Sequence, residues 1–121
     1  MKKEDLKKRF FAFAVSIVHY SEILPNRKPL EISKDQIIRS ASSSACNYRA
    51  VCRAKSDADF VNKLKIVEEE LDETLFWLEF IRAIEKTGVN ENLKLSGEGD
   101  ELLAIIVSTI KTSRNKIYNK P

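Results

Sequence analysis

The stretch IIRSASSSACNYRAVCRAKSDADFVNKLKIVEEELDETLFWLEFI, residues 37–81, decides the fold of this chain. In its first half, residues 40–45 are all serine or alanine. Serine is a weak helix former, so this helix depends on close packing against a neighbour. In its second half, apolar side chains recur at heptad-like spacing, which predicts a long helix in near-parallel bundle packing. These positions are Phe60, Leu64, Val67, Leu71, Thr74, Leu78 and Ile81.

Helical signals continue before this stretch. Apolar residues at spacings of three and four predict a first helix that Pro25 and Pro29 end. The sequence from Ser33 to Gln36 has the S-x-x-Q pattern of a capping box, which predicts that the second helix begins there.

After the stretch, Ser56 is the expected cap of the third helix and Gly88 the residue that follows its end. Residues 88–99 contain three glycines and are expected to form a loop. The expected helices are 5–24, 34–55, 57–86 and 100–118. With no strand alternation in the sequence, the prediction is all-α: a left-handed, up-down-up-down four-helix bundle forming a single domain over residues 1–121.

The first helix has more apolar surface than one bundle seam requires. Beside its main stripe runs a second stripe, formed by Phe11, Val15 and Val18. Such a surface must be covered by two neighbouring helices or by another subunit. These three residues are therefore the candidate oligomer surface.

Composition narrows the class of protein. With 43% hydrophobic and 32% charged residues, the chain can bury a core and has no apolar run long enough to span a membrane. The first ten residues lack the apolar segment of a signal peptide, so a cytoplasmic protein is expected. Cys46 and Cys52 are six residues apart on one helix and are not expected to form a disulfide with each other.

Charge is unevenly distributed. Residues 1–65 hold 14 Lys and Arg against 7 Asp and Glu, residues 66–101 hold 3 against 11, and residues 102–121 hold 4 against none. The basic and acidic segments could neutralise each other, or the basic ends could stay free to meet phosphates. The candidate nucleic-acid contacts are Lys7, Lys8, Arg9, Lys111, Arg114 and Lys116, with Lys120 at the same basic end.

Arg49 and Arg53 share a face of the second helix, opposite acidic positions of the third. One interpretation is a half-buried polar network that fixes helix register; the other is that these arginines point outward toward phosphates. The candidate network comprises Asn47, Arg49, Arg53, Lys63, Glu69, Glu70 and Glu73.

No catalytic, cofactor or metal site is expected. Bundle di-metal centres need Glu-x-x-His motifs, and this sequence has one histidine, His19, and no such motif. Neither cysteine has a sequence cue for thiolate activation.

A series of short elements matches a known family: Arg39-Ser40, Ala45-Cys46-Asn47-Tyr48-Arg49-Ala50, Arg53-Ala54, Phe60, Lys63-Leu64, Glu69-Glu70, Glu73-Thr74, Phe76-Trp77-Leu78-Glu79 and Ile110-Lys111-Thr112. In these elements the chain resembles the four-helix-bundle proteins encoded by intervening sequences in bacterial 23S rRNA genes. The resemblance implies an up-down bundle that assembles into a homopentamer, with no established biochemical activity. Related accessory proteins of diversity-generating retroelements engage nucleic acid and a reverse transcriptase.

From charge and resemblance together, we expect a non-enzymatic, self-assembling scaffold able to bind structured RNA through its basic surface. The alternative is a protein-interaction or assembly module that binds no nucleic acid. No membrane and no small-molecule substrate is expected as a partner.

Overall fold

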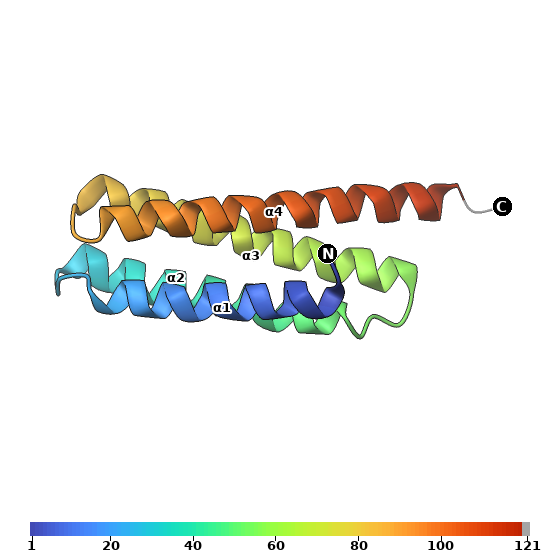
Figure 1. Ribbon diagram of the computed structural model, residues 1–121, viewed down its shortest axis with the longest axis horizontal. Coiled ribbons are helices and arrows are strands. Elements are labelled where there is room, and N and C mark those ends of the chain that lie inside the picture. Colours follow the sequence, from blue (N-terminus) through green and yellow to red (C-terminus); the bar gives the residue numbers. More distant parts are fainter. Residues whose placement is uncertain (120–121) are drawn as a thin grey trace.

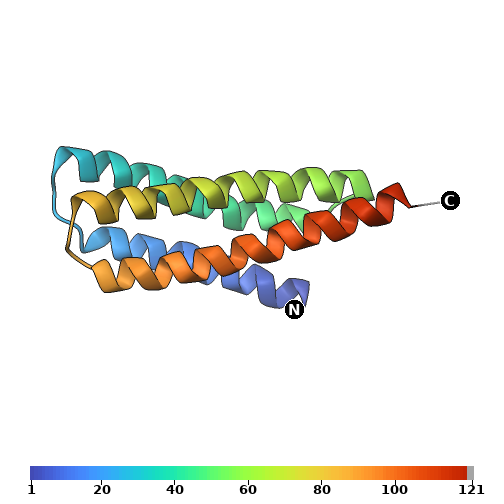
Figure 2. The same cartoon turned by 90° about the horizontal axis from the view of Figure 1, so that it is seen from above.

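Four long helices run alternately up and down in the computed structural model, which describes residues 1–119 (Figures 1 and 2). Each helix packs against the next in the chain, and α4 also packs against α1, so α1 and α3 lie diagonally opposite each other in the bundle. The arrangement confirms the all-α four-helix bundle. The helices are α1 (Lys3–Glu22), α2 (Lys28–Val51), α3 (Asp57–Ile84) and α4 (Val89–Tyr118).

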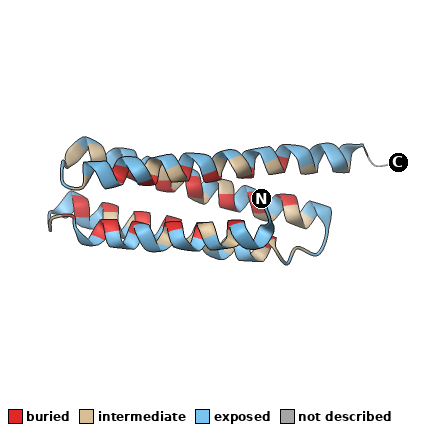
Figure 3. Cartoon of the chain, viewed as in Figure 1, coloured by how far each residue is buried: buried red, intermediate tan, exposed pale blue. Residues whose placement is uncertain are grey.

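The core lies along the inward face of every helix (Figure 3). The heptad positions predicted on α3 are fully buried from Leu64 to Ile81, and Phe60, nearest the helix start, is half-buried. Burying a Leu, Ile or Phe side chain contributes about 1.5–3 kcal/mol each. The bundle is therefore held mainly by these apolar seams.

The small side chains of α2 face α3. Ser40, Ala41 and Ser44 are completely buried, and the Ser40 hydroxyl oxygen lies 2.8 Å from the hydroxyl oxygen of Thr74 on α3. Thr74 in turn donates to the Glu70 carbonyl. Every buried side-chain polar atom in residues 1–119 has a hydrogen-bond partner, so these hydroxyls are compatible with a tightly packed interior.

The predicted start of the second helix at residue 34 is wrong. α2 begins at Lys28, with Pro29 in its first turn, where a missing N–H costs nothing and the fixed φ suits a helix. Ser33 is buried inside the helix, and its hydroxyl donates to the Pro29 carbonyl over 2.7 Å, so it forms no capping box. The helix also ends earlier than expected, at Val51. The expected Ser56 cap is confirmed, since its hydroxyl accepts the Asp59 N–H.

The predicted loop over residues 88–99 is also wrong, because α4 begins at Val89. Gly88 does not directly follow α3, which ends at Ile84. It has a φ of 69°, and a Cβ there would lie 2.7 Å from Ile23. Gly99 lies inside α4 for a different reason: a Cβ there would lie 2.8 Å from the Leu75 side chain. These glycines serve a turn and a close helix contact, and they do not mark a loop.

α1 begins and ends two residues earlier than expected. None of the helices within residues 1–119 is long and apolar enough to cross a membrane.

The two glycines inside α4 provide a matched test of this packing. A Cβ at Gly97 would meet nothing within 4 Å, so Gly97→Ala should stabilise the protein by about 0.5–1 kcal/mol through helix propensity. Gly99→Ala should not gain this stability, because the Leu75 methyl at 2.8 Å and the Phe13 ring at 3.3 Å must shift to admit the Cβ. Chemical denaturation of the two variants measures both effects. Equal stabilisation by the two substitutions would contradict the close contact at Gly99.

Glu85 anchors the turn between α3 and α4. Its carboxylate accepts hydrogen bonds from the Thr87 hydroxyl at 2.7 Å, from the Arg27 guanidinium at 2.7 Å and from the Thr87 backbone N–H at 3.1 Å. These bonds, the Thr87 hydroxyl first, lower the pKa of Glu85 to about 2 from an ordinary 4.5.

Because the folded-state pKa is depressed, the stabilisation from ionised Glu85 is complete above pH 4.5 and is lost as the pH falls toward about 2. Thr87→Val should raise the pKa of Glu85 and make the loss of stability across this window shallower. Carboxyl NMR titration and acid unfolding measure the two effects, with exposed Thr112→Val as the control. A pKa that is unchanged in Thr87→Val would contradict this account of the turn.

Candidate interaction surfaces

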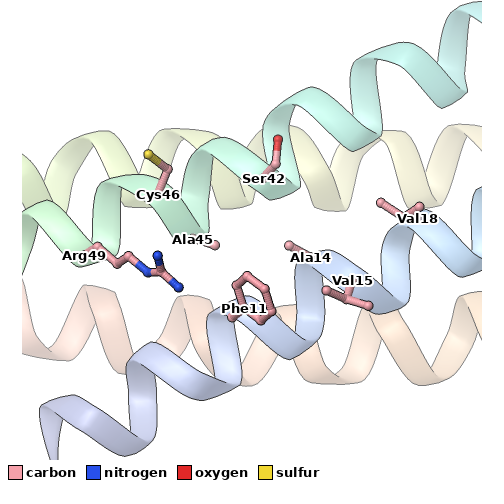
Figure 4. A pocket seen from close by; sticks show the side chains of 8 residues that line it. All are labelled: Phe11, Ala14, Val15, Val18, Ser42, Ala45, Cys46 and Arg49. Carbon is pink, nitrogen blue, oxygen red and sulfur yellow. The ribbon is translucent and has the colours of Figure 1, made fainter.

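An open apolar groove runs between α1 and α2 (Figure 4). It has a volume of about 270 Å³. The side chains of α1 form one wall, and small residues of α2 leave the other wall shallow. Its lining residues are Phe11, Ala14, Val15 and Val18 from α1 and Ser42, Ala45, Cys46 and Arg49 from α2.

The groove exists because the second apolar stripe of α1 points away from the core. Phe11 is 54% exposed, and Val15 and Val18 are 39% and 36% exposed. The Arg49 guanidinium lies over the Phe11 ring, 5.4 Å from its centroid, in a cation–π contact. In the single chain, the apolar surface that the sequence indicated is therefore uncovered.

A second exposed apolar surface lies on α3, and we call it the ridge: Ile66, Phe76, Trp77 and Phe80. The rings of Phe76 and Phe80 each meet the Trp77 ring edge-on, with centroids 4.9 and 5.4 Å apart. Phe76 is 52% exposed. In the sequence, Ile66 and Trp77 already stand outside the heptad seam, on a second face of this helix that mixes polar and apolar residues. The further signal in the sequence was the spacing of Phe76 and Phe80, which lie about one helical turn apart.

The two termini lie at the same end of the bundle (Figure 1), and the sequence places basic residues at the start of α1 and the end of α4. α4 has 30 residues against 20 in α1 and extends beyond it, carrying Lys111, Arg114 and Lys116 in exposed positions. None of these three forms an ion pair with residues 1–119; Glu68 shares a shallow pocket with Lys111 and Arg114 but stays beyond ion-pair distance. Lys120 lies outside the described residues.

The basic residues of α1 are used differently. Arg9 binds Glu98 of α4 at 2.6 Å and Glu101 at 3.2 Å, and the hydrogen bond to Glu98 is the main reason its pKa is raised. Lys7 pairs with Glu4 on its own helix. Lys8 is exposed and has no ion pair within residues 1–119. Arg9 therefore joins two helices, while Lys8 remains open to solvent.

The predicted polar network does not form as expected. Glu70 and Glu73 of α3 pair with Arg39, at 3.1 Å for Glu70, and not with Arg49 or Arg53. In an antiparallel pair, residues equally far from the connecting turn meet, and Arg49 and Arg53 lie too near the turn to reach these carboxylates.

The other members of that predicted network have separate roles. Asn47 donates to the Ser43 carbonyl at 2.9 Å, and Lys63 binds Asp59 at 2.5 Å. Arg53 and Glu69 are exposed. The residues named from sequence thus form no single network, and Arg49 lies at the groove between α1 and α2.

The sequence matches the family described as 23S rRNA-intervening sequence protein over residues 2–108. This chain belongs to that family. The crystal structure of a protein with unknown function from the S23 ribosomal protein family of Bacteroides thetaiotaomicron VPI-5482 is similar, with a TM-score of 0.82 and 33% identity over 92% of this chain and 99% of that chain. No curated protein matches the chain. The comparisons agree with the bundle and assign no chemistry.

For this family member, the described residues contain no group of three or more His, Cys, Asp or Glu placed to hold a metal ion. His19 lies at the surface, 3.2 Å from Glu22. Cys46 is exposed in the groove, Cys52 is half-buried, and both are free thiols.

Sequence reasoning missed a buried polar cluster centred on Asn92, which it placed in a loop. The Asn92 amide donates to the Tyr20 hydroxyl at 2.8 Å and to the Leu78 carbonyl at 2.9 Å. Its carbonyl oxygen accepts from Arg82 at 2.5 Å. The cluster joins α1, α3 and α4, and burial raises the pKa of Tyr20.

Removing the Asn92 amide should destabilise the bundle, because buried polar partners are left unpaired at about 1–3 kcal/mol each. We expect Asn92→Ala to lower the free energy of unfolding, measured in urea, by about 2 kcal/mol or more. Asn90→Ala, exposed two residues earlier, should change stability by less than about 0.5 kcal/mol. A similar small effect of both substitutions would show that the Asn92 cluster contributes little.

Proposed function

We propose that this protein is a non-enzymatic helical scaffold that assembles with copies of itself and binds nucleic acid, structured RNA above all, through its basic end. A homopentamer is the state that the family resemblance implies. The binding mechanism is electrostatic: Lys and Arg side chains displace counterions condensed on phosphates.

The observation that carries this proposal is the uncompensated charge at the end of α4. Lys111, Arg114 and Lys116 are exposed, form no ion pair within residues 1–119, and lie in a segment, residues 102–119, without a single Asp or Glu. Clustered like charges repel one another, so a polyanion that neutralises them is a favourable partner.

The same end offers little for reading bases. Tyr118, 91% exposed, is the aromatic side chain of the last turn. Phosphate contacts position a protein on nucleic acid without reading its sequence, whereas base stacking needs aromatic platforms. The proposed binding therefore depends on backbone shape and charge density.

Self-assembly strengthens such binding. A single chain presents only a few phosphate contacts, and linking several such sites in one particle raises the overall affinity without new contacts. The groove and the ridge supply the apolar surface for assembly. Those surfaces also favour the second candidate, a protein-interaction module that binds no nucleic acid.

The test is binding to a structured RNA over a series of salt concentrations. Wild-type affinity should fall steeply as salt rises, and K111E/R114E/K116E should lose at least about tenfold in affinity and flatten the log–log salt slope by about 0.7–0.9 per lost contact. The control variant K28E/K86E/K94E changes net charge equally, using exposed lysines that form no ion pair within residues 1–119.

Equal loss in both variants would show that net charge alone matters, and salt-insensitive or absent binding at low salt would reject the nucleic-acid proposal. Recovery of a defined protein partner without nucleic acid would favour the interaction module.

A further inference from the structure

We propose that the ridge on α3 of one copy docks into the groove between α1 and α2 of the next copy. This inference rests on the self-assembly in the proposed function and specifies its two surfaces. The contact is heterologous: each copy uses one surface toward one neighbour and the other surface toward the opposite neighbour.

The two surfaces are complementary in kind. The groove is hollow and apolar, with Val15, Val18 and Ala45 in its lining. The ridge carries Phe76 and Phe80, exposed and packed around Trp77. Exposed aromatic side chains that fill an apolar pocket are the usual anchors of protein interfaces.

Charge favours the same pairing. A second hollow, which shares Phe11 and Arg49 with the groove, is also lined by Lys8 and by the ion pair of Lys7 with Glu4, so its net charge is positive. Glu69 and Asp72 lie exposed beside the ridge, and neither forms an ion pair within residues 1–119. A ridge–groove contact brings these opposite charges together at its rim, which guides orientation more than it adds affinity.

The groove and the ridge lie at the same level along the bundle axis. Gly99 of α4 lies against both Phe13 of α1 and Leu75 of α3, so these two residues are at the same level. α1 and α3 run in the same direction and rise equally per residue. Val18 lies five residues after Phe13, and Phe80 lies five residues after Leu75. In the other direction, Lys8 lies five residues before Phe13, and Glu70 lies five residues before Leu75.

A neighbour generated by rotation about an axis parallel to the helices is not shifted along them. It therefore brings Phe80 to the level of Val18, Phe76 close to that of Val15, and Glu69 close to that of Lys8. Apolar groups meet apolar groups, and the carboxylate meets the ammonium, without any sliding of one copy past the next.

The positions of the two surfaces around the bundle favour a closed ring. The groove is on the α1–α2 side, and the ridge is beside Glu73, which pairs with Arg39 on the α2–α3 side. These are adjacent sides of a four-cornered bundle. Each ridge–groove contact therefore turns the next copy in the same sense, and repeated turns of this kind can close into a ring of a few copies.

Mixing two assembly-deficient variants tests the pairing directly. V15E/V18E disables the groove and F76E/F80E disables the ridge. Both change exposed positions, and circular dichroism checks that each variant is folded. Each variant alone should have the mass of one chain. An equimolar mixture should form a one-to-one dimer and nothing larger, because only one intact ridge and one intact groove remain. The control I32E/L93E, at exposed apolar positions elsewhere, should keep the wild-type mass.

Trp77 gives an independent readout, since it is the single tryptophan of the chain. Assembly covers it, so wild-type emission should be shifted to the blue relative to V15E/V18E, whose α3 is unchanged. Cys46 in the groove should react faster with a thiol reagent in F76E/F80E than in wild type.

The outcomes separate this inference from the proposed function. If the wild-type protein has the mass of one chain even when concentrated, self-assembly itself is rejected. If wild type assembles but either variant keeps its mass, or the mixture stays monomeric, only the ridge–groove contact is overturned. RNA binding at the basic end is measured separately: loss of assembly should lower the overall affinity, whereas the salt dependence of the contacts made by one chain should remain.

Discussion

The close approach of α2 and α3 is the constraint on which the remaining geometry depends. Small side chains on α2 bring the backbones together, and the hydroxyl contact between Ser40 and Thr74 sets how far one helix is displaced along the other. That register brings Arg39 to two carboxylates of α3 and leaves Arg49 to rest on Phe11. The packing of α2 against α3 thus decides which arginine of α2 meets carboxylates and which one is left at the groove.

Periodicity was sufficient to predict four helices, the buried heptad positions of α3 and the surplus apolar stripe of α1. It failed where residues with strong local preferences are overruled by packing. Pro29 fits inside the first turn of α2 and Ser33 bonds backward to it, so a capping pattern lies in mid-helix. Gly99 lies inside α4, where it permits close contact with Leu75 of α3, and it was mistaken for a loop residue.

The polar contacts were harder to predict than the fold, for a physical reason. A hydrophobic stripe tells which face of a helix is buried, but a shift of one turn along the axis keeps that face while exchanging every charged partner. The acidic residues near the middle of α3 were correctly predicted to pair with an arginine. The arginine that pairs with them is Arg39, and not the predicted Arg49 or Arg53. The Asn92 cluster depends on three helices and on a segment expected to be a loop, so no local pattern could reveal it.

The alternating direction of the helices leaves the charges of the molecule sorted along its length. Cations crowd the end where α4 extends beyond α1, carboxylates such as Glu70, Glu73 and Glu98 occupy the middle, and the opposite end mixes both signs. The bundle therefore has a permanent electric dipole moment along its axis. In a closed assembly of parallel copies, the components of the dipole moments across the axis cancel by symmetry, and the components along the axis add. The dipole moment of the particle therefore increases with each copy. Such a particle can be oriented by the field of a polyanion before any contact forms.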